Sequence, residues 1–394
     1  MKLTTLTNKA GTKQAIIIIL INMLPMMAII SLVPIVPAII QKFKDIPNIG
    51  ILAPMVLAAP GLCVALLSPY AGYLSDKVGR RKLLLIFTLL YGIGGIIPFF
   101  IESFPLLLGS RLVLGIGEAF ILTIGSSLWG DYYNEKDRAK WIVIQSITGT
   151  FLAALLLSLS GYLSTYGWNF PFLVYNIAFI IFIGALFFIY EPQIKSKEKI
   201  ISSNKQKLAV STVATLCIPT FIAAIVYFSY TLHFSLVLDA IGITDNVKIG
   251  NYSAIASIGA PIGALMYKLV QNKSIATKLA FMGMFYAIGF IGTGLGGNEY
   301  FVVASAVIAQ LGVGLTFPVL MAWSLNNLPA AFRARGMGFW TTSFFLGQFL
   351  SPVVLSGVKE LSGGLLNAYI FIGLFCLFAS IVNIFYSIRK NNKI

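Results

Sequence analysis

Residues 72–82 read Gly72-Tyr73-Leu74-Ser75-Asp76-Lys77-Val78-Gly79-Arg80-Arg81-Lys82, a short segment that holds one acid and four cations. Apolar runs flank it on both sides, at 49–73 and 83–101. Each run has roughly the 20 residues that an α-helix needs to cross a bilayer. The segment is therefore expected to be a turn between two membrane-spanning helices, with its cations at the membrane surface.

The same alternation continues along all 394 residues, of which 58% are hydrophobic and 10% charged, with a mean hydropathy of +0.89. Such a composition excludes a water-soluble domain. The first apolar run is too long for a cleavable signal peptide and is expected to be a spanning helix. The sequence predicts an all-α membrane protein with twelve transmembrane helices, at 15–40, 49–73, 83–101, 105–130, 141–164, 169–190, 209–238, 249–267, 279–297, 301–325, 336–358 and 365–388.

The charges predict the orientation of these helices. The chain has 28 Lys and Arg against 13 Asp and Glu, a formal net charge of +15. If the N-terminus is cytoplasmic, 23 of the 28 cations fall on the cytoplasmic side, four fall outside, and Arg111 lies within a span. Cytoplasmic loops carry such an excess. We therefore expect a multi-pass protein of the bacterial cytoplasmic (inner) membrane with both termini in the cytoplasm, and no nucleic-acid partner.

A long polar segment near the middle divides the chain. It covers about 191–208 and separates a six-helix half, 1–190, from a second six-helix half, 209–394. A shift of 197 residues lays Leu114-Gly115-Ile116-Gly117 on Leu311-Gly312-Val313-Gly314, and a shift of 191 lays the segment from Gly72 on that from Gly263. The halves are therefore expected to be parallel pseudo-repeats, related by an axis along the membrane normal.

The segment 72–82 resembles the G-x-L-x-D-R-x-G-R-R/K motif of the major facilitator superfamily, from which it departs at Lys77. The resemblance extends over the whole chain, because the chain has the family's plan of six helices followed by six more. It implies the fold of that superfamily and transport by alternating access. In that family the motif holds the halves together on the cytoplasmic side in the outward-open state. By resemblance, Asp76 would face a helix start near Gly336, and Arg80 would pair with Asp131. The latch set so implied is Gly72, Asp76, Gly79, Arg80, Arg81, Asp131 and Arg138.

The fourth span contains two charges, Arg111 and Glu118. Charges within a span are costly and mark transport pathways or proton relays by default. Seven residues apart, the two share a helical face at a separation of about 10 Å along the axis. They are either a coupling site for protons and substrate or a structural pair that holds this helix to a neighbour.

The segment 111–119, Arg-Leu-Val-Leu-Gly-Ile-Gly-Glu-Ala, favours the first interpretation by resemblance. Arg111 and Gly115 match the R-x-x-x-G motif associated with proton-coupled members of the superfamily. The whole stretch is similar to the spinster branch and to organic-anion symporters, which share an Arg and a Glu at this spacing. On this resemblance Glu118 would bind a proton from one side and release it to the other when Arg111 approaches.

Further polar residues are candidates for a central cavity. His233, the single histidine, is interpreted either as a cavity residue that binds substrate or protons, or as a packing residue. Each of the other candidates could instead form a hydrogen bond between helices. They are Asn22, Gln145, Gln310, Trp323, Trp340 and Gln348.

These residues indicate a function without catalysis. One histidine and the scattered Cys63, Cys217 and Cys376 provide neither a catalytic constellation nor a metal or disulfide spacing, and there is no phosphate-binding loop. We therefore expect no enzyme activity, no cofactor and no metal. The expected partners are a small-molecule substrate, protons as coupling ion and the lipid bilayer. The protein is expected to be a monomer.

The signature of the superfamily's drug:proton antiporters is missing, because helix five has 156–161 in place of Gly-Pro-x-x-Gly-Gly. Helix one has Asn22 but no acid, where spinster-like and several multidrug members have a carboxylate. The run 32–39 and Gly167-Trp168 nevertheless look like the drug-efflux branch. The expected function is proton-coupled efflux, as an antiporter, of a small organic or amphipathic compound by a secondary active transporter. The alternatives are proton-coupled uptake of an organic anion held by Arg111, and a non-transporting membrane sensor on the same scaffold.

Overall fold

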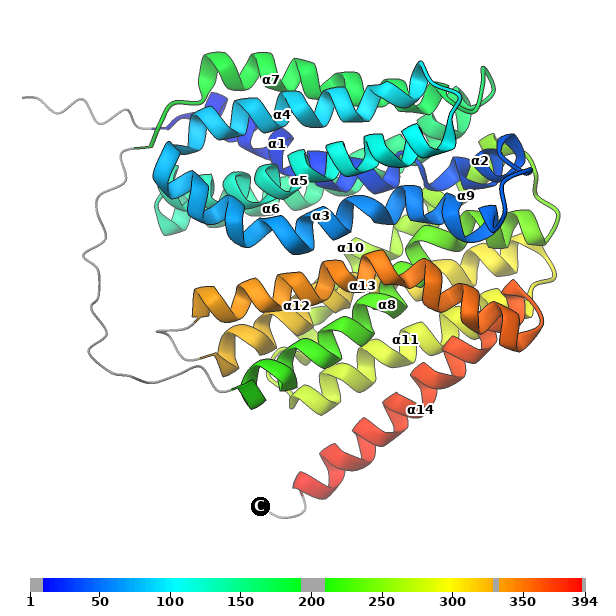
Figure 1. Cartoon of the computed structure of the whole chain (residues 1–394). Helices are drawn as coiled ribbons and strands as arrows, with labels where there is room; N and C mark the ends of the chain where they lie inside the picture. Colours follow the sequence, from blue (N-terminus) through cyan, green and yellow to red (C-terminus); the bar gives the residue numbers. More distant parts are fainter. Residues whose placement is uncertain (1–9, 193–209, 329–332, 392–394) are drawn as a thin grey trace, which may run out of the picture.

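The structure is a computed structural model that describes residues 10–192, 210–328 and 333–391 (Figure 1). Within these ranges every regular element is a helix, and twelve helices are long and apolar enough to cross a membrane. The prediction of an all-α protein with twelve spans is thus confirmed. The central segment expected at 191–208 lies outside the described residues, apart from its first two.

The first half contains seven α-helices and three short 3₁₀ segments. They are α1 (Thr12–Ile30), η1 (Val33–Ile35), α2 (Val36–Lys42), α3 (Ile49–Val78), α4 (Arg80–Ile96), η2 (Ile97–Phe99), α5 (Phe104–Tyr132), α6 (Glu135–Leu163), η3 (Phe170–Asn176) and α7 (Ile177–Phe188). The second half consists of α8 (Val210–Ala240), α9 (Asn246–Ser257), α10 (Gly259–Val270), α11 (Ile275–Leu295), α12 (Glu299–Asn327), α13 (Arg333–Ser362) and α14 (Leu365–Asn391).

Two of the spans are interrupted helices. The first span runs through α1, η1 and α2, and its 3₁₀ turn begins beside Pro34, with Pro37 at the start of α2. The span from Asn246 to Val270 divides at Ile258 into α9 and α10, and Pro261 follows in the first turn of α10. Proline lacks the N–H that continues a helix, and membrane helices tolerate it where neighbours satisfy the freed groups. Both interrupted spans contribute to the cavity described below.

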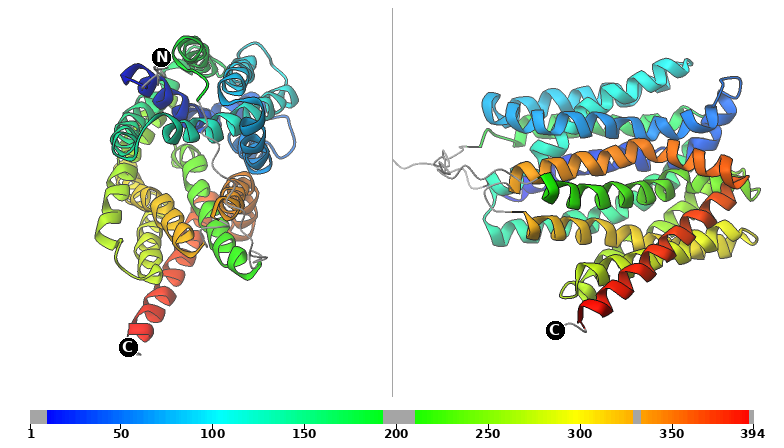
Figure 2. Two further views of the ribbon diagram at one scale, coloured as in Figure 1. Left: turned by 90° about the vertical axis from the view of Figure 1, so that its left-hand side faces the viewer. Right: turned by 60° about the horizontal axis from the view of Figure 1, so that its bottom comes forward.

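The two halves pack around separate hydrophobic cores. One core is built mainly from α1–α7 and the other from α8–α14. Figure 1 shows the first group in the upper part of the molecule and the second in the lower part. We call the end of the bundle where α1 and α8 begin and α14 ends the terminal end, which faces the viewer in the left panel of Figure 2, and the other the opposite end.

Contacts between the halves concentrate toward the opposite end. There α6 packs along α9, and α2 and η1 pack against α8, while α3 runs beside α13. The approach of α6 to α9 depends on glycine: a Cβ on Gly250 would lie 2.6 Å from the carbonyl oxygen of Leu157, and a Cβ on Gly161 would collide with the carbonyl oxygen of Asn246. The two halves are therefore closed against each other at the opposite end.

Candidate functional site

A cavity of about 670 Å³ lies between the two halves. The first half contributes residues of α1, η1 and α6, and the second contributes residues of α8, α9, α10 and α12. None of the side chains that line it is charged, and the polar ones are hydroxyl groups and one amide. The lining residues are Met26, Ile30, Val33, Ile142, Val143, Ser146, Ile147, Thr150, Ala153, Leu157, Tyr227, Thr231, Phe234, Ser253, Ser257, Ala260, Pro261, Ala264, Leu265, Gln310 and Val313.

One of the six polar or aromatic candidates, Gln310, lines this cavity. Two others join helices within the first half. The amide nitrogen of Asn22 donates to the carbonyl oxygens of Ile18, 2.9 Å away, and Gly125 on α5, 3.1 Å away. The amide oxygen of Gln145 accepts a hydrogen bond from the Trp129 indole at 3.0 Å. These two amides hold α1 and α6 to α5.

The other three candidates lie in the second half, away from the lining. Gln348 is fully buried where α13 meets α3, and a Cβ on Gly61 would lie 2.8 Å from its side-chain carbonyl carbon. Trp340 is 3% exposed and stacks on Phe344. Trp323 is half-buried on α12, near its end at the terminal side. In this conformation the structure thus separates these residues from the cavity.

Arg111 lies inside the first half and is fully buried. One guanidinium nitrogen, Nη2, donates to the carbonyl oxygens of Gly94 at 2.8 Å and Gly95 at 3.0 Å, both on α4. The guanidinium carbon lies 5.1 Å from the ring centre of Phe172 and 5.0 Å from that of Tyr175, both in η3. Carbonyl dipoles and aromatic faces both attract a cation. Arg111 therefore ties α5 to α4 and η3.

Glu118 lies on the same helix and is 1% exposed. Its Oε2 has no hydrogen-bond partner, and it forms no ion pair with Arg111, among the residues that the structure describes. The α5 turn around it packs tightly: a Cβ on Gly115 would lie 2.7 Å from the Cα of Pro60 on α3, and one on Gly117 would lie 2.8 Å from the carbonyl oxygen of Phe87 on α4. Glu118 is thus a buried acid without a direct counter-ion in the described part of the chain.

His233 lines a different, smaller cavity of about 230 Å³ near the opposite end. This cavity also lies between the halves, with Asn48 of the first half and Lys359 and Glu360 of the second among its lining residues. The imidazole is 4% exposed, and its Nδ1 lies 3.2 Å from the carbonyl oxygen of Ser229. The structure places His233 at the contact between halves and apart from the central cavity.

Three of the five charged members of the latch set meet at the terminal end. Arg80 forms ion pairs with Asp131 and with Asp76, the latter at 3.3 Å. The side chain of Asp76 is 67% exposed. Its ion pair and hydrogen bond are with Arg80, and in the described residues it has no contact of this kind with the second half near Gly336. In this conformation the three charges interact within the first half.

Other members of the latch set shape the α3–α4 turn and its surroundings. Gly79 has φ +104°, a backbone conformation that only glycine adopts readily, and it separates α3 from α4. A Cβ on Gly72 would lie 3.7 Å from the methyl group of Thr123 on α5. The Arg138 guanidinium on α6 lies close to Gly130, the residue before Asp131.

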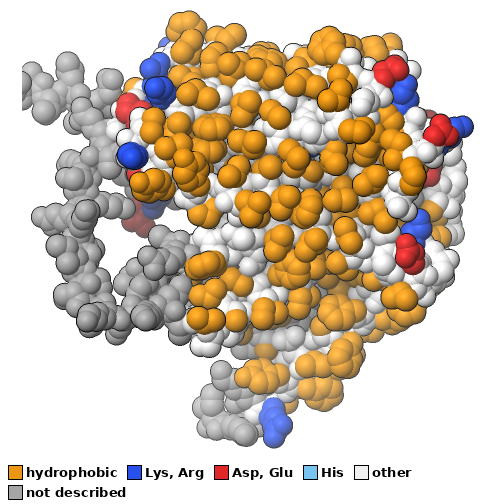
Figure 3. All heavy atoms as spheres, viewed as in Figure 1, with side chains coloured by type: hydrophobic (Ala, Val, Ile, Leu, Met, Phe, Trp, Pro, Cys, Tyr) orange, Lys and Arg blue, Asp and Glu red, His pale blue; other side chains and the backbone are white. Residues whose placement is uncertain are grey.

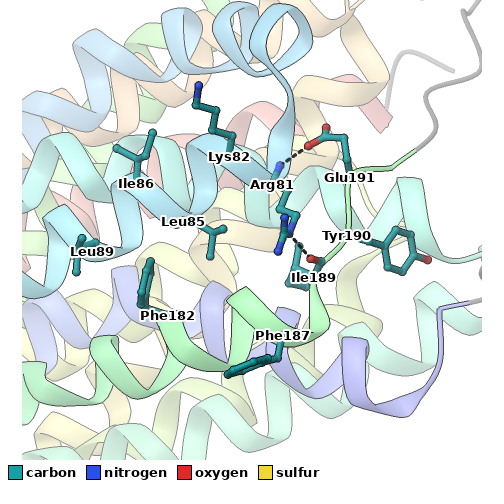
Figure 4. Close-up of a pocket in the computed structure, with 10 residues that line it drawn as sticks. All are labelled: Arg81, Lys82, Leu85, Ile86, Leu89, Phe182, Phe187, Ile189, Tyr190 and Glu191. Carbon is teal, nitrogen blue, oxygen red and sulfur yellow. Dashed lines mark hydrogen bonds between the residues drawn. The ribbon is translucent and has the colours of Figure 1, made fainter.

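A residue that the sequence analysis missed, Glu191, caps the start of α4. Its carboxylate accepts hydrogen bonds from the backbone N–H groups of Arg80 at 2.6 Å and Arg81 at 2.9 Å. Figure 4 shows the bond to Arg81. In return the Arg81 side chain donates to the carbonyl oxygens of Ile189 at 2.6 Å and Leu186 at 2.8 Å, at the end of α7. Gly79 has no side chain that could cap the four free N–H groups of α4, and this is the signal in the sequence that their acceptors come from elsewhere, without indicating which residue supplies them.

The described residues contain no group of three or more His, Cys, Asp or Glu side chains that could hold a metal ion. The arrangement that they do show is two bundles of six spans around a central cavity, with a charged cluster at one end. This architecture defines the class of secondary transporters built from two repeats.

The chain belongs to the Major Facilitator Superfamily, whose sequence model matches residues 16–352. It is 22% identical over 394 residues to the putative metabolite transport protein YyaJ of Bacillus subtilis strain 168, covering 86% of this chain and 84% of the relative. It is 23% identical over 344 residues to the bacillibactin exporter of the same strain, covering 80% and 82%. A solved structure of a D-xylose–proton symporter superposes with a TM-score of 0.78 at 13% identity, covering 94% and 96%.

Membership in this superfamily confirms the resemblance drawn from residues 72–82. It identifies the chain as a membrane transporter with a small-molecule substrate. The low identity to the symporter means that its structure supports the fold alone.

Proposed function

We propose that this protein exports a small, neutral amphipathic compound in exchange for protons, by alternating access of the central cavity. The observation that carries the proposal is the uncharged lining of that cavity. A charged substrate would lose its hydration there without gaining a counter-ion, which is costly. An apolar compound with a few polar atoms would instead find apolar walls and the amide of Gln310. The direction is supported by one relative, the bacillibactin exporter.

Alternating access is supported by the distribution of contacts. The halves are closed at the opposite end through α6 and α9. At the terminal end, Arg80 and Asp131 pair within the first half and leave Asp76 largely exposed. We infer that Asp76 contacts the start of α13 in the other conformation, in which the terminal end closes. With the terminal end in the cytoplasm, the present conformation faces inward.

Glu118 is the group that we propose to exchange the proton. It is buried and without a counter-ion in the described chain, so its charge state depends on what approaches it. A charged carboxylate in such a place costs several kcal/mol unless a partner forms. A conformational change that alters the surroundings of Glu118 therefore alters the proton affinity of its carboxylate. Exchange of one proton for one neutral compound would move one net charge per cycle.

The alternative of organic-anion uptake receives less support. Arg111, the cation that would hold the anion, faces α4 and η3 and does not line the central cavity. An anion in the cavity would face no cationic side chain of its lining. Uptake of an organic anion is therefore the alternative that would stand if the test below contradicts the proposed export.

The test uses proteoliposomes that contain a fluorescent pH indicator. Addition of N-phenyl-1-naphthylamine, a neutral amphipathic compound, is expected to change the internal pH when the membrane potential is clamped, whereas nicotinate, an organic anion, is not. The Glu118→Gln variant is expected to bind the compound but to move no protons. Coupled proton movement with nicotinate alone would replace the proposal by anion transport, and full coupling in Glu118→Gln would refute the role of Glu118.

A further inference from the structure

An open groove of about 780 Å³ lies on the outer surface of the first half, between α4 and α7 (Figure 4). Its walls are apolar along most of their length. Leu85, Ile86 and Leu89 come from α4, and Phe182 and Phe187 come from α7. No part of the proposed transport function uses this groove, since it is separate from the cavity between the halves.

The groove faces the lipid. Both α4 and α7 lie at the edge of the molecule in Figures 1 and 2, on the side away from the second half. Ile86 is 48% exposed and Phe187 is 74% exposed. In Figure 3 hydrophobic side chains cover this part of the surface, and Lys and Arg gather toward its terminal end. In a bilayer these walls contact acyl chains.

The terminal end of the groove is positively charged. Nε and Nη2 of Arg81 donate to two backbone carbonyl oxygens, which orient the guanidinium but do not neutralise it. Lys82 stands at the rim and has no ion-pair or hydrogen-bond partner in the described part of the chain (Figure 4). Two adjacent cations thus lie where the apolar walls meet the membrane surface.

The acid in this region, Glu191, offsets one of the two cations and leaves a net charge of +1 on the three side chains. Both of its oxygens are directed at the backbone N–H groups of Arg80 and Arg81. The carboxylate therefore already fills the anion site that the N-terminus of α4 would offer. An incoming anion is left with the side chains of Lys82 and Arg81.

We propose that this groove binds a phospholipid with an anionic headgroup. One acyl chain lies along the apolar walls between α4 and α7, and the headgroup phosphate contacts Lys82 and the free edge of the Arg81 guanidinium. Basic pockets between membrane helices at the membrane surface bind such headgroups. The apolar walls are needed as well as the cations, which separates this site from one that takes free phosphate.

The test is native mass spectrometry of the full-length protein, released from detergent that contains equal amounts of phosphatidylglycerol and phosphatidylcholine with the same acyl chains. We expect one retained phosphatidylglycerol per protein, in preference to phosphatidylcholine. Lys82→Gln is expected to weaken this retention about fivefold, the effect of one cation near the surface. Leu89→Trp fills the groove while keeping the charge and is expected to abolish retention.

Two matched variants control for unspecific effects. Lys273→Gln removes an exposed cation of the second half, and Leu361→Trp adds an indole at a position that is 91% exposed on α13. Both are expected to retain the lipid as the wild type does. Equal retention of the two lipids, or equal loss in Lys82→Gln and Lys273→Gln, would overturn the proposal. Retention unchanged by Leu89→Trp, together with binding of inorganic phosphate alone, would reduce the site to a phosphate site.

Discussion

At the scale of single residues, Arg111 and Glu118 have different surroundings although they share one face of α5. Arg111 is held by two carbonyl oxygens and two aromatic rings, whereas the Oε2 of Glu118 has no partner in the described chain. On this geometry we propose that Arg111 is a structural cation and that Glu118 is the coupling acid. Of the two roles left open by the sequence, Arg111 fits the structural one.

This division predicts the effect of Arg111→Lys. A lysine keeps the charge but lacks the planar guanidinium, which lies close to the rings of Phe172 and Tyr175 while its Nη2 donates to the carbonyl oxygens on α4. We expect a loss of roughly 1.5–3 kcal/mol, the value of a hydrogen bond to a charged group, and a lower thermal unfolding midpoint in detergent. Arg138→Lys at the terminal end is the matched control and is expected to leave the midpoint unchanged. An unchanged midpoint in Arg111→Lys, with a raised KM for transport, would instead identify Arg111 as a substrate-binding residue.

The sequence predicted which residues are unusual but not what they contact. Hydropathy located Arg111 and Glu118 within a span, because a charge stands out in an apolar run. Their partners are backbone carbonyls on α4 and rings in η3, which leave no pattern in the sequence at a fixed distance from residue 111. The same reason explains why Asn22 and Gln145 were interpreted as cavity candidates: a polar side chain in a span looks alike whether it bonds a neighbouring helix or faces a cavity.

At the scale of elements, the contact of α6 with α9 holds the opposite end closed. Gly250 lies so close to the α6 backbone that a Cβ would be 2.6 Å from the carbonyl oxygen of Leu157. The obstacle is backbone, which cannot rotate away as a flexible side chain can. The two helices must therefore separate if a side chain is added here.

Gly250→Ala is accordingly expected to shift the protein toward the conformation that is open at the opposite end. Spin labels at Tyr166 and Thr244, which lie beside α6 and α9 at that end, measure the separation by double electron–electron resonance in a background without native cysteines. We expect a longer distance in Gly250→Ala. Gly109→Ala on α5, where a Cβ meets nothing within 4 Å, is expected to give the wild-type distance. Identical distances in all three proteins would show that this contact does not control the conformation.

Composition predicted the boundaries of several helices, but it did not predict where a span is interrupted or how a helix start is capped. The spans expected at 49–73 and 105–130 correspond to α3 and α5, because unbroken apolar runs can only be helices in a membrane. The division of one span into α9 and α10 and the capping of α4 by Glu191 were not predicted. The cap depends on a neighbour that is distant in sequence, 111 positions after Arg80, whereas the division of the span lies next to Gly259 and Pro261.

At the scale of the whole molecule, the cavity is formed by the two halves together. Its lining comes from α1, η1 and α6 on one side and from α8, α9, α10 and α12 on the other, so a movement of one half against the other changes its access. The arrangement in two halves could be expected from the repeat of Leu114-Gly115-Ile116-Gly117 in the second half. The cavity residues could not, because most are apolar and resemble every other residue of a membrane helix.

The central claim is that one cavity is reached in turn from each end of the molecule, and the most direct measurement is labelling of Thr231→Cys. Thr231 lines the cavity from α8, and the native Cys63, Cys217 and Cys376 are replaced by serine for the experiment. A membrane-impermeant maleimide is applied to right-side-out vesicles and, separately, to inverted vesicles. We predict that this cysteine reacts from both sides and that the transported compound protects it from both. Reaction from a single side, unchanged in Gly250→Ala, would contradict alternating access and would favour a non-transporting sensor.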